Sequence, residues 1–163
     1  MATDGKPGLP IVAKPESFAH VPPPTPNESK EAYIKRQVKT RQSMEGPQYE
    51  LSKHILSERI TRLADRSYCP HCESRQAAAS LFTGMEDRRT KLKTILAPKV
   101  VIHGLEDPVV PVEAGRDVAP NIPGAELRLI PGMGHDLPVA LVKSIADGNT
   151  AAASRAASLN QGE

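Results

Sequence analysis

Aromatic residues are scarce in this chain of 163 residues, which has two phenylalanines, three tyrosines and no tryptophan. Any hydrophobic core must therefore be small and mostly aliphatic, because aromatic side chains normally bury the largest areas. Charge of one sign is also lacking: 21 basic residues against 19 acidic ones leave a formal net charge of +2. This balance gives no electrostatic indication of binding to nucleic acid or to a membrane. The length suits one domain and excludes a two-domain enzyme.

Long apolar runs are absent as well. No stretch approaches the roughly 20 apolar residues of a membrane-spanning helix, and the first residues lack the apolar run of a signal peptide. We therefore expect a soluble, cytoplasmic protein. The two cysteines, Cys69 and Cys72, cannot build a framework of several disulfides, and in the cytosol both thiols are expected to be reduced.

Proline is concentrated at the start of the chain, where residues 1–27 hold seven of the sixteen prolines. Proline lacks a backbone N–H and disfavours helical backbone in the residue before it, so an extended segment is predicted. Scattered apolar side chains in this segment favour a strap that lies on the rest of the protein over a free arm or a polyproline ligand.

Residues 28–96 have the pattern of a helical region, with apolar residues recurring at intervals of three or four. No strand is predicted among them. Three or four short helices are expected, over 29–44, 49–66 and 73–82, with residues 88–95 adding a further turn or two. The basic residues of this region, among them Arg36, Arg41 and Arg88, are interspersed with acidic ones. We interpret them as solvated helix faces rather than as a phosphate-binding surface.

Strands are expected in residues 97–147. Two strands and two helices are predicted in alternation, over 99–103, 112–121, 125–130 and 138–147. The first strand is a β-branched run, which is typical of a strand buried on both faces. A strand–helix–strand unit makes a right-handed crossover, so the two strands are predicted to be parallel neighbours. Residues 148–163 show no period and are predicted to be a disordered tail.

Acidic and imidazole side chains follow the two strands. Glu106 and Asp107 lie in the loop after the first strand, and His135 lies in the loop after the second. The carboxyl ends of adjacent parallel strands lie side by side, at the edge of the sheet where ligands bind. A carboxylate and an imidazole at this edge can form a hydrogen bond that fixes the histidine tautomer and stabilises its protonated form. Such a pair is a usable general base, and it still needs a nucleophile.

Two segments of this region resemble the last strands of α/β-hydrolases. Residues 97–111 read Ala-Pro-Lys-Val-Val-Ile-His-Gly-Leu-Glu-Asp-Pro-Val-Val-Pro and resemble the seventh strand with its acid loop. Residues 122–138 begin Ile-Pro-Gly-Ala-Glu-Leu, end Gly-Met-Gly-His-Asp-Leu-Pro, and resemble the eighth strand with its catalytic-histidine loop. Three upstream segments resemble, more loosely, the cap region of esterase-like and haloperoxidase-like members: 65–68, 75–76 and 87–89. The resemblance implies that Asp107 is the acid and His135 the general base of a catalytic triad.

The implied fold class is α/β. It is an incomplete α/β-hydrolase fold, in which a helical cap is followed by a strand–helix–strand–helix unit with two parallel strands. The serine nucleophile is missing, because the family carries it in a Gly-x-Ser-x-Gly turn and no serine here lies between two such glycines. The resemblance covers the cap and the last two strands, which is the C-terminal half of a complete hydrolase. We therefore expect a truncated or split member.

The resemblance also implies a parent reaction, the hydrolysis of a carboxylic ester or a similar small substrate by a Ser-His-Asp triad. No metal or organic cofactor is implied. Without a nucleophile the isolated chain is expected to be inactive, and to require a separate N-terminal half or to self-associate through an exposed sheet edge. The alternative is a non-catalytic remnant or a module that binds a partner.

Neighbours of the predicted pair have simpler explanations. His103 lies within the first strand and is expected to support the acid loop by packing or by one hydrogen bond. Glu106 and Asp136 are alternative acids or supporting partners, ranked below Asp107 because the turn at Asp107 and Pro108 resembles the family's acid position. Asp-Pro also starts ordinary turns, so a turn residue remains the alternative for Asp107.

The sequence Cys69-Pro70-His71-Cys72 resembles the redox centre of thioredoxin-fold oxidoreductases, where a helix N-terminus favours the thiolate. That chemistry needs a preceding buried strand, whereas residues 60–68 have a helical pattern. A zinc site needs four ligands, and His54 is the only further candidate nearby. We interpret the cysteines as ordinary cap residues, with a thiol-redox or metal-binding module as the alternative.

Overall fold

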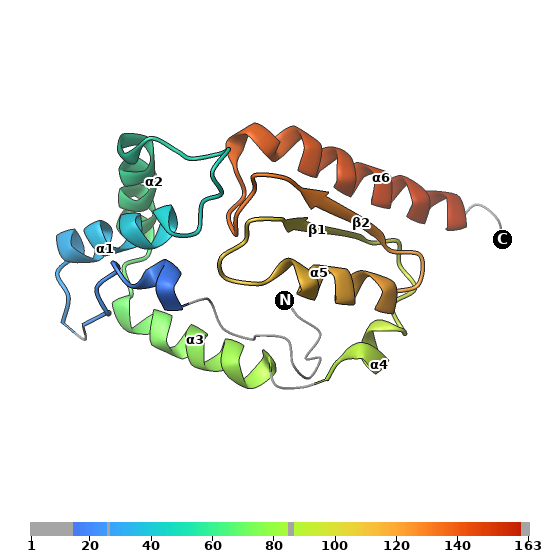
Figure 1. Cartoon of the computed structure of the whole chain (residues 1–163), viewed down its shortest axis with the longest axis horizontal. Coiled ribbons are helices and arrows are strands. Elements are labelled where there is room, and N and C mark those ends of the chain that lie inside the picture. The colour runs from blue at the N-terminus through green and yellow to red at the C-terminus, as the bar shows by residue number, and fades with distance from the viewer. Residues whose placement is uncertain (1–14, 26, 85–86, 161–163) are drawn as a thin grey trace.

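The computed structural model describes residues 15–25, 27–84 and 87–160. In these ranges the chain is a helical region followed by a small α/β unit (Figure 1). The elements of the helical region are η1 (Pro15–Phe18), α1 (Lys30–Gln42), α2 (Lys53–Arg66), α3 (Pro70–Gly84) and α4 (Arg89–Leu92). Those of the α/β unit are β1 (Val100–Gly104), α5 (Val112–Val118), η2 (Ala119–Asn121), β2 (Glu126–Ile130), η3 (Val139–Leu141) and α6 (Val142–Asn160).

The two strands pair in parallel, with Val100 opposite Glu126 and Gly104 opposite Ile130. The sequence prediction of two parallel neighbours is therefore confirmed. Figure 1 shows the strands between α5 and α6, and both helices contact β1. This arrangement brings the carboxyl ends of β1 and β2, and the loops that follow them, to one edge of the sheet.

Serine side chains start the first two α-helices of the helical region. Ser29 accepts a hydrogen bond from the backbone N–H of Ala32, at 3.2 Å, and Ser52 does the same for Ile55, at 3.4 Å. Such caps satisfy N–H groups that have no partner within the helix. They place the starts of α1 and α2 near 30 and 53, so the second helix begins four residues later than the predicted residue 49.

The core of the helical region is small and aliphatic, as the sequence predicts. Val38 of α1 packs with Leu56 and Ile60 of α2, and all three are buried. In the α/β unit the buried apolar residues include Ala114, Ile122 and Met133, and no aromatic side chain joins the buried set of the described residues. None of the described helices is both long and apolar enough to cross a membrane.

The C-terminal residues differ from the prediction. Residues 148–160 form the second part of α6, where the sequence predicted a disordered tail. Alanine is the strongest helix former, and residues 151–157 hold five alanines. Arg155 also forms an ion pair with Glu126 of β2, with 3.2 Å between Nη1 and Oε2, which ties the helix to the sheet. The prediction of a disordered tail is wrong because alanine propensity and the Arg155 contact stabilise this helix without apolar periodicity.

Arg36 corrects the interpretation of the basic residues as solvated helix faces. Its side chain is only 6% exposed and forms ion pairs with Glu28, at 2.7 Å, and with Glu73 of α3, at 2.9 Å. The hydrogen bonds to Glu28 raise the pKa of the Arg36 guanidinium above its usual value. Arg88 is buried as well. Partners from other elements decide this burial, and helical periodicity does not predict them.

Residues 1–14 and 26, part of the predicted Pro-rich strap, lie outside the described residues. Within the described part, residues 15–18 form one turn of 3₁₀ helix, and His20 Nε2 lies 3.0 Å from the Ser43 hydroxyl at the end of α1. This end of the segment therefore contacts the helical region.

Candidate active site

Asp107 lies in the loop that follows β1, and its two carboxylate oxygens have different partners. Oδ1 accepts hydrogen bonds from the backbone N–H groups of Val109 and Val110, each at 2.8 Å. Aspartate commonly stabilises a turn in this way. Since Oδ1 holds the loop in shape, Oδ2 is left to interact across the sheet edge.

His135 follows β2 and meets Asp107 at that edge. Its Nδ1 lies 2.8 Å from Oδ2 of Asp107. A carboxylate can only accept, so Nδ1 carries the hydrogen and Nε2 is the ring nitrogen that can take up a proton. The Asp107 side chain is 6% exposed and that of His135 is 35% exposed, so the carboxylate is shielded while the imidazole reaches solvent. No hydrogen bond to Nε2 is formed within the described ranges.

The ionised form of Asp107 is favoured in this position. Burial raises the pKa of the carboxyl group, but the hydrogen bonds from His135, Val110 and Val109 outweigh burial and hold the pKa below its usual value. The pair is therefore a carboxylate facing an imidazole, which is the arrangement that stabilises an imidazolium once the ring takes up a proton.

The loop of His135 is held from the other side by the segment between α1 and α2. The backbone N–H of His135 donates to the carbonyl of Met44 at 2.8 Å, and the N–H of Gln48 donates to Gly132 at 3.3 Å. A side chain on Gly134 would collide with the Met44 carbonyl and with the backbone of Gly46. Glycine is thus required at 134 for the close approach of these two backbones.

His103 supports the acid loop, as the sequence predicts. The residue is buried in β1, and its Nε2 donates to the carbonyl of Val110 at 3.0 Å. The same nitrogen lies 3.6 Å from Oδ2 of Asp107, which is outside hydrogen-bond distance but close enough for an electrostatic contact. Gly115 of α5 makes room for the ring.

The alternative acids have other surroundings. Glu106 Oε2 accepts a hydrogen bond from the backbone N–H of Gly132 at 2.8 Å, so this residue links the two loops. Asp136 has a buried Oδ1 without a hydrogen-bond partner in the described structure, and burial raises its pKa. Glu45 likewise has a buried Oε1 without such a partner, and burial and then the charge of Asp136 raise its pKa. Asp107 is the carboxylate that is hydrogen-bonded to His135.

Two cavities flank the pair. One, of about 400 Å³, is lined by β1, α5 and the two loops, and none of its lining residues has a hydroxyl or thiol group. The other, of about 620 Å³, lies between α1, α2 and the residues that follow His135, with Asp136 and Leu137 in its wall. Four arginines line it: Arg41, Arg59, Arg62 and Arg66.

The arginines of this second cavity are not among the site residues that the sequence predicts, and Arg41 is there interpreted as part of a solvated helix face. Arg59, Arg62 and Arg66 are spaced by three and four residues, so they share one face of α2. That spacing could have indicated from the sequence that the three arginines lie on one face of α2. It could not indicate that this face lines a cavity, because the cavity forms only when α1 and the His135 loop pack against α2.

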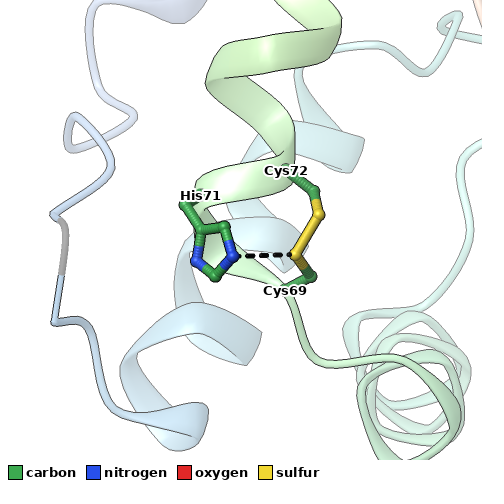
Figure 2. Close-up of side chains that lie close together, drawn as sticks. All are labelled: Cys69, His71 and Cys72. Atoms are coloured by element: carbon green, nitrogen blue, oxygen red, sulfur yellow. Dashed lines mark hydrogen bonds between the residues drawn. A yellow bond between two sulfur atoms is a disulfide. The ribbon is translucent and has the colours of Figure 1, made fainter.

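The cysteines correct a further expectation. Cys69 and Cys72 form a disulfide, so the expectation of two reduced thiols is wrong. Helical backbone at the start of α3 places their Cα atoms 5.4 Å apart, which is within disulfide range. Figure 2 shows the His71 ring beside Cys69, with Nε2 3.4 Å from Sγ. His54, the fourth ligand considered for zinc, is instead exposed on α2 beside Glu58.

Several solved structures have a fold similar to that of this chain, at low sequence identity. No family model matches the chain. Esterase RhEst1 from Rhodococcus sp. ECU1013 is 21% identical, with a TM-score of 0.58 over 88% of this chain and 49% of that chain. The meta-cleavage product hydrolase CumD from Pseudomonas fluorescens IP01 is 15% identical, with a TM-score of 0.51 over 100% of this chain and 55% of that chain.

The esterase EaEST from Exiguobacterium antarcticum is 18% identical, with a TM-score of 0.50 over 86% of this chain and 47% of that chain. The chain therefore spans about half the length of these structures. Its fold is an incomplete α/β-hydrolase fold, as the sequence resemblance predicts.

Proposed function

We propose that this chain supplies the acid and the base of a Ser-His-Asp triad, and that the serine comes from a part of the protein that these residues do not include. The observation that carries the proposal is the hydrogen bond between Asp107 and His135, at the carboxyl ends of two parallel strands. The reaction is the hydrolysis of a carboxylic ester or a similar small substrate.

In this reaction His135 moves the proton. Nε2 takes the proton of the serine hydroxyl as its oxygen attacks the ester carbonyl, and then gives it to the departing alcohol. A water molecule repeats the sequence to release the acid and free the serine. Asp107 stays ionised throughout, orients the ring through Nδ1 and stabilises the imidazolium. Its lowered pKa supports this role.

The missing strands attach to the free edge of β1. β2 pairs with one edge of β1, and within the described residues no strand pairs with the other. By resemblance β1 corresponds to the seventh strand of the complete fold, so the strand that precedes it belongs on this edge. By the same resemblance the Gly-x-Ser-x-Gly turn follows the fifth strand. A sixth strand paired with β1, and a parallel fifth strand further along the same sheet, therefore bring the serine to the edge where His135 lies.

The helical region covers the substrate. The segment at 44–48 rests on the His135 loop, and the arginine-lined cavity opens beside it. Within the described ranges no carboxylate lies within 4.0 Å of the four arginine side chains, but Asp136 of the same wall interacts electrostatically with Arg41 and Arg59. The wall also contains Leu56, Ile60 and Leu63. An ester that carries a carboxylate on an apolar chain suits both parts of this wall.

The test is to express residues 1–163 alone and together with the N-terminal half of a full-length α/β-hydrolase, and to assay two p-nitrophenyl esters. One ester is neutral and the other carries a terminal carboxylate. We expect no turnover from the chain alone, turnover from the combination, and a preference for the carboxylate ester. His135→Ala should reduce turnover at least a thousandfold, whereas His54→Ala, at an exposed site on α2, should leave it unchanged.

Turnover by the isolated chain would show that the nucleophile is present after all. A folded complex that contains the serine turn and still lacks activity would support the alternative of a non-catalytic remnant.

A further inference from the structure

Three reactive side chains lie together at the start of α3 and take no part in the proposed hydrolysis. Cys69 precedes the helix, and His71 and Cys72 belong to its first turn. The two Sγ atoms and one ring nitrogen of His71 lie within 4.8 Å of one another. Figure 2 shows the disulfide on one side of the helix end and the imidazole turned toward the sulfur of Cys69.

We propose that Cys69 and Cys72 are a redox-active dithiol–disulfide centre that exchanges with low-molecular-weight thiols of the glutathione class. The proposal rests on three properties of the group: its accessibility, the surroundings of one sulfur, and the independence of the helix start from the disulfide.

Accessibility comes first, because an attacking thiolate must reach a sulfur. His71 and Cys72 are exposed and Cys69 is partly buried. The disulfide therefore lies at the surface, unlike structural disulfides that are enclosed in a core. Cys72 is the more exposed of the two cysteines and is the one that an external thiolate attacks.

The surroundings of Cys69 favour it as the leaving group. Its sulfur lies at the N-terminus of a helix of 15 residues, where unpaired backbone N–H groups stabilise negative charge. His71 Nε2 lies 3.4 Å from the same sulfur and, when it carries the hydrogen, donates to it. Both effects stabilise a thiolate on Cys69, and a stabilised thiolate leaves a disulfide faster.

The disulfide is not needed to hold the helix start. A disulfide stabilises a protein less when it closes a shorter loop, and this one spans a sequence separation of only 3. The backbone N–H of Cys72 donates to the carbonyl of Cys69 at 3.0 Å, which needs no disulfide. Glu73 in addition joins Arg36 of α1, so the first turn of α3 is held to the helical region by side chains on the next residue. The centre can therefore be reduced without unfolding.

Reduction of the disulfide proceeds in two exchange steps through a mixed disulfide. A thiolate attacks Sγ of Cys72, a new sulfur–sulfur bond forms, the bond to Cys69 breaks, and its electron pair leaves on Cys69 as a thiolate. A second thiolate attacks the external sulfur of the mixed disulfide, forms the small-molecule disulfide and releases Cys72 as a thiolate. In sum the protein disulfide gains two electrons, two thiols become one disulfide, and their protons pass to the cysteines or to solvent.

The test uses residues 1–163 in glutathione buffers of graded ratio, with alkylation and mass spectrometry to count free thiols. We expect the disulfide to reach equilibrium with the buffer through a detectable mixed disulfide on Cys72. For the reduced protein at pH 6 we expect iodoacetamide to modify Cys69 on the order of tenfold faster than Cys72, because thiolate fraction sets the rate.

Two variants and unfolding in urea test whether the folded surroundings of Cys69 cause its higher reactivity. His71→Ala should reduce the excess reactivity of Cys69 several-fold, His54→Ala should not change it, and unfolding in urea should abolish it. Far-UV circular dichroism should be the same before and after reduction. A disulfide that stays closed at every glutathione ratio, or equal alkylation of both cysteines in the folded protein, would overturn the proposal. The outcome is independent of esterase activity, so it does not depend on the proposed function.

Discussion

Asp107 combines two tasks in one side chain. One oxygen fixes the turn of the acid loop through Val109 and Val110, and the other holds His135. A loop that moved would therefore move the histidine as well, because the same carboxylate connects both. The sequence leaves open that Asp107 is only a turn residue. In the structure Asp107 both stabilises the turn and contacts His135.

Replacing this side chain tests its structural role. Asp107→Ala leaves two backbone N–H groups and Nδ1 of His135 without their acceptor, in a position where the side chain is 6% exposed. The free energy of unfolding at pH 7 should fall by about 2 to 3 kcal/mol, as measured by urea denaturation. Asp147→Ala, which removes an exposed carboxylate from α6, should change it by less than about 0.5 kcal/mol. Equal effects would contradict the role given to Asp107.

The same variant should show a pH dependence. The pKa of Asp107 is lower in the folded protein than in the unfolded chain. Its contribution to stability is therefore complete above the unfolded value of about 3.9 and is lost as the pH falls through the folded value. Urea denaturation between pH 7 and pH 3 should show the gap between wild type and Asp107→Ala narrowing below about pH 4. A constant gap would mean that Asp107 titrates in the same way in both states.

At the scale of elements, glycine has a different effect at two positions. At Gly134 it permits a close contact between two backbones, whereas at Gly148 it only weakens a helix. Gly134 lies against the backbone at Met44, so Gly134→Ala should destabilise the protein by about 2 to 3 kcal/mol and loosen the helical region from the His135 loop. Gly148 lies within α6, and its nearest neighbour is the flexible end of Arg128. Gly148→Ala should therefore stabilise by up to about 1 kcal/mol, because alanine favours helix.

Thermal unfolding of the two glycine variants provides the measurement. An equal fall of the melting temperature in both variants would mean that the added methyl group destabilises either position alike. An unchanged melting temperature in Gly134→Ala would show that the segment at 44–48 does not rest on the His135 loop.

The elements themselves were largely predictable. Apolar spacing indicated α1 and α2, and the β-branched run at 99–103 indicated β1, because these signals reside in neighbouring residues. Boundaries depended on single side chains such as Ser52, whose hydroxyl caps α2 and moves its start. The second part of α6 was missed because alanine propensity and the Arg155 contact, rather than apolar periodicity, stabilise it.

At the scale of the whole molecule, a sheet of two strands leaves long edges without partners. Within the described residues β1 and β2 pair only with each other. Exposed edges bind other strands, so the isolated chain should self-associate as its concentration rises. Adding the N-terminal half of a full-length α/β-hydrolase should suppress this association and raise the melting temperature, as followed by sedimentation and calorimetry. An isolated chain that stays monomeric with a high melting temperature would contradict this view.

The sequence by itself determined that the two strands are parallel and that an acidic loop and a histidine loop follow them, since strand topology depends on local pattern and on the handedness of the crossover. It could also exclude a Gly-x-Ser-x-Gly turn by inspection. Only the tertiary structure decided that Arg36 is buried, that the segment at 44–48 holds the His135 loop, and that four arginines share a cavity. These features join side chains far apart in the chain, and their positions depend on how separate elements pack, which no local pattern records.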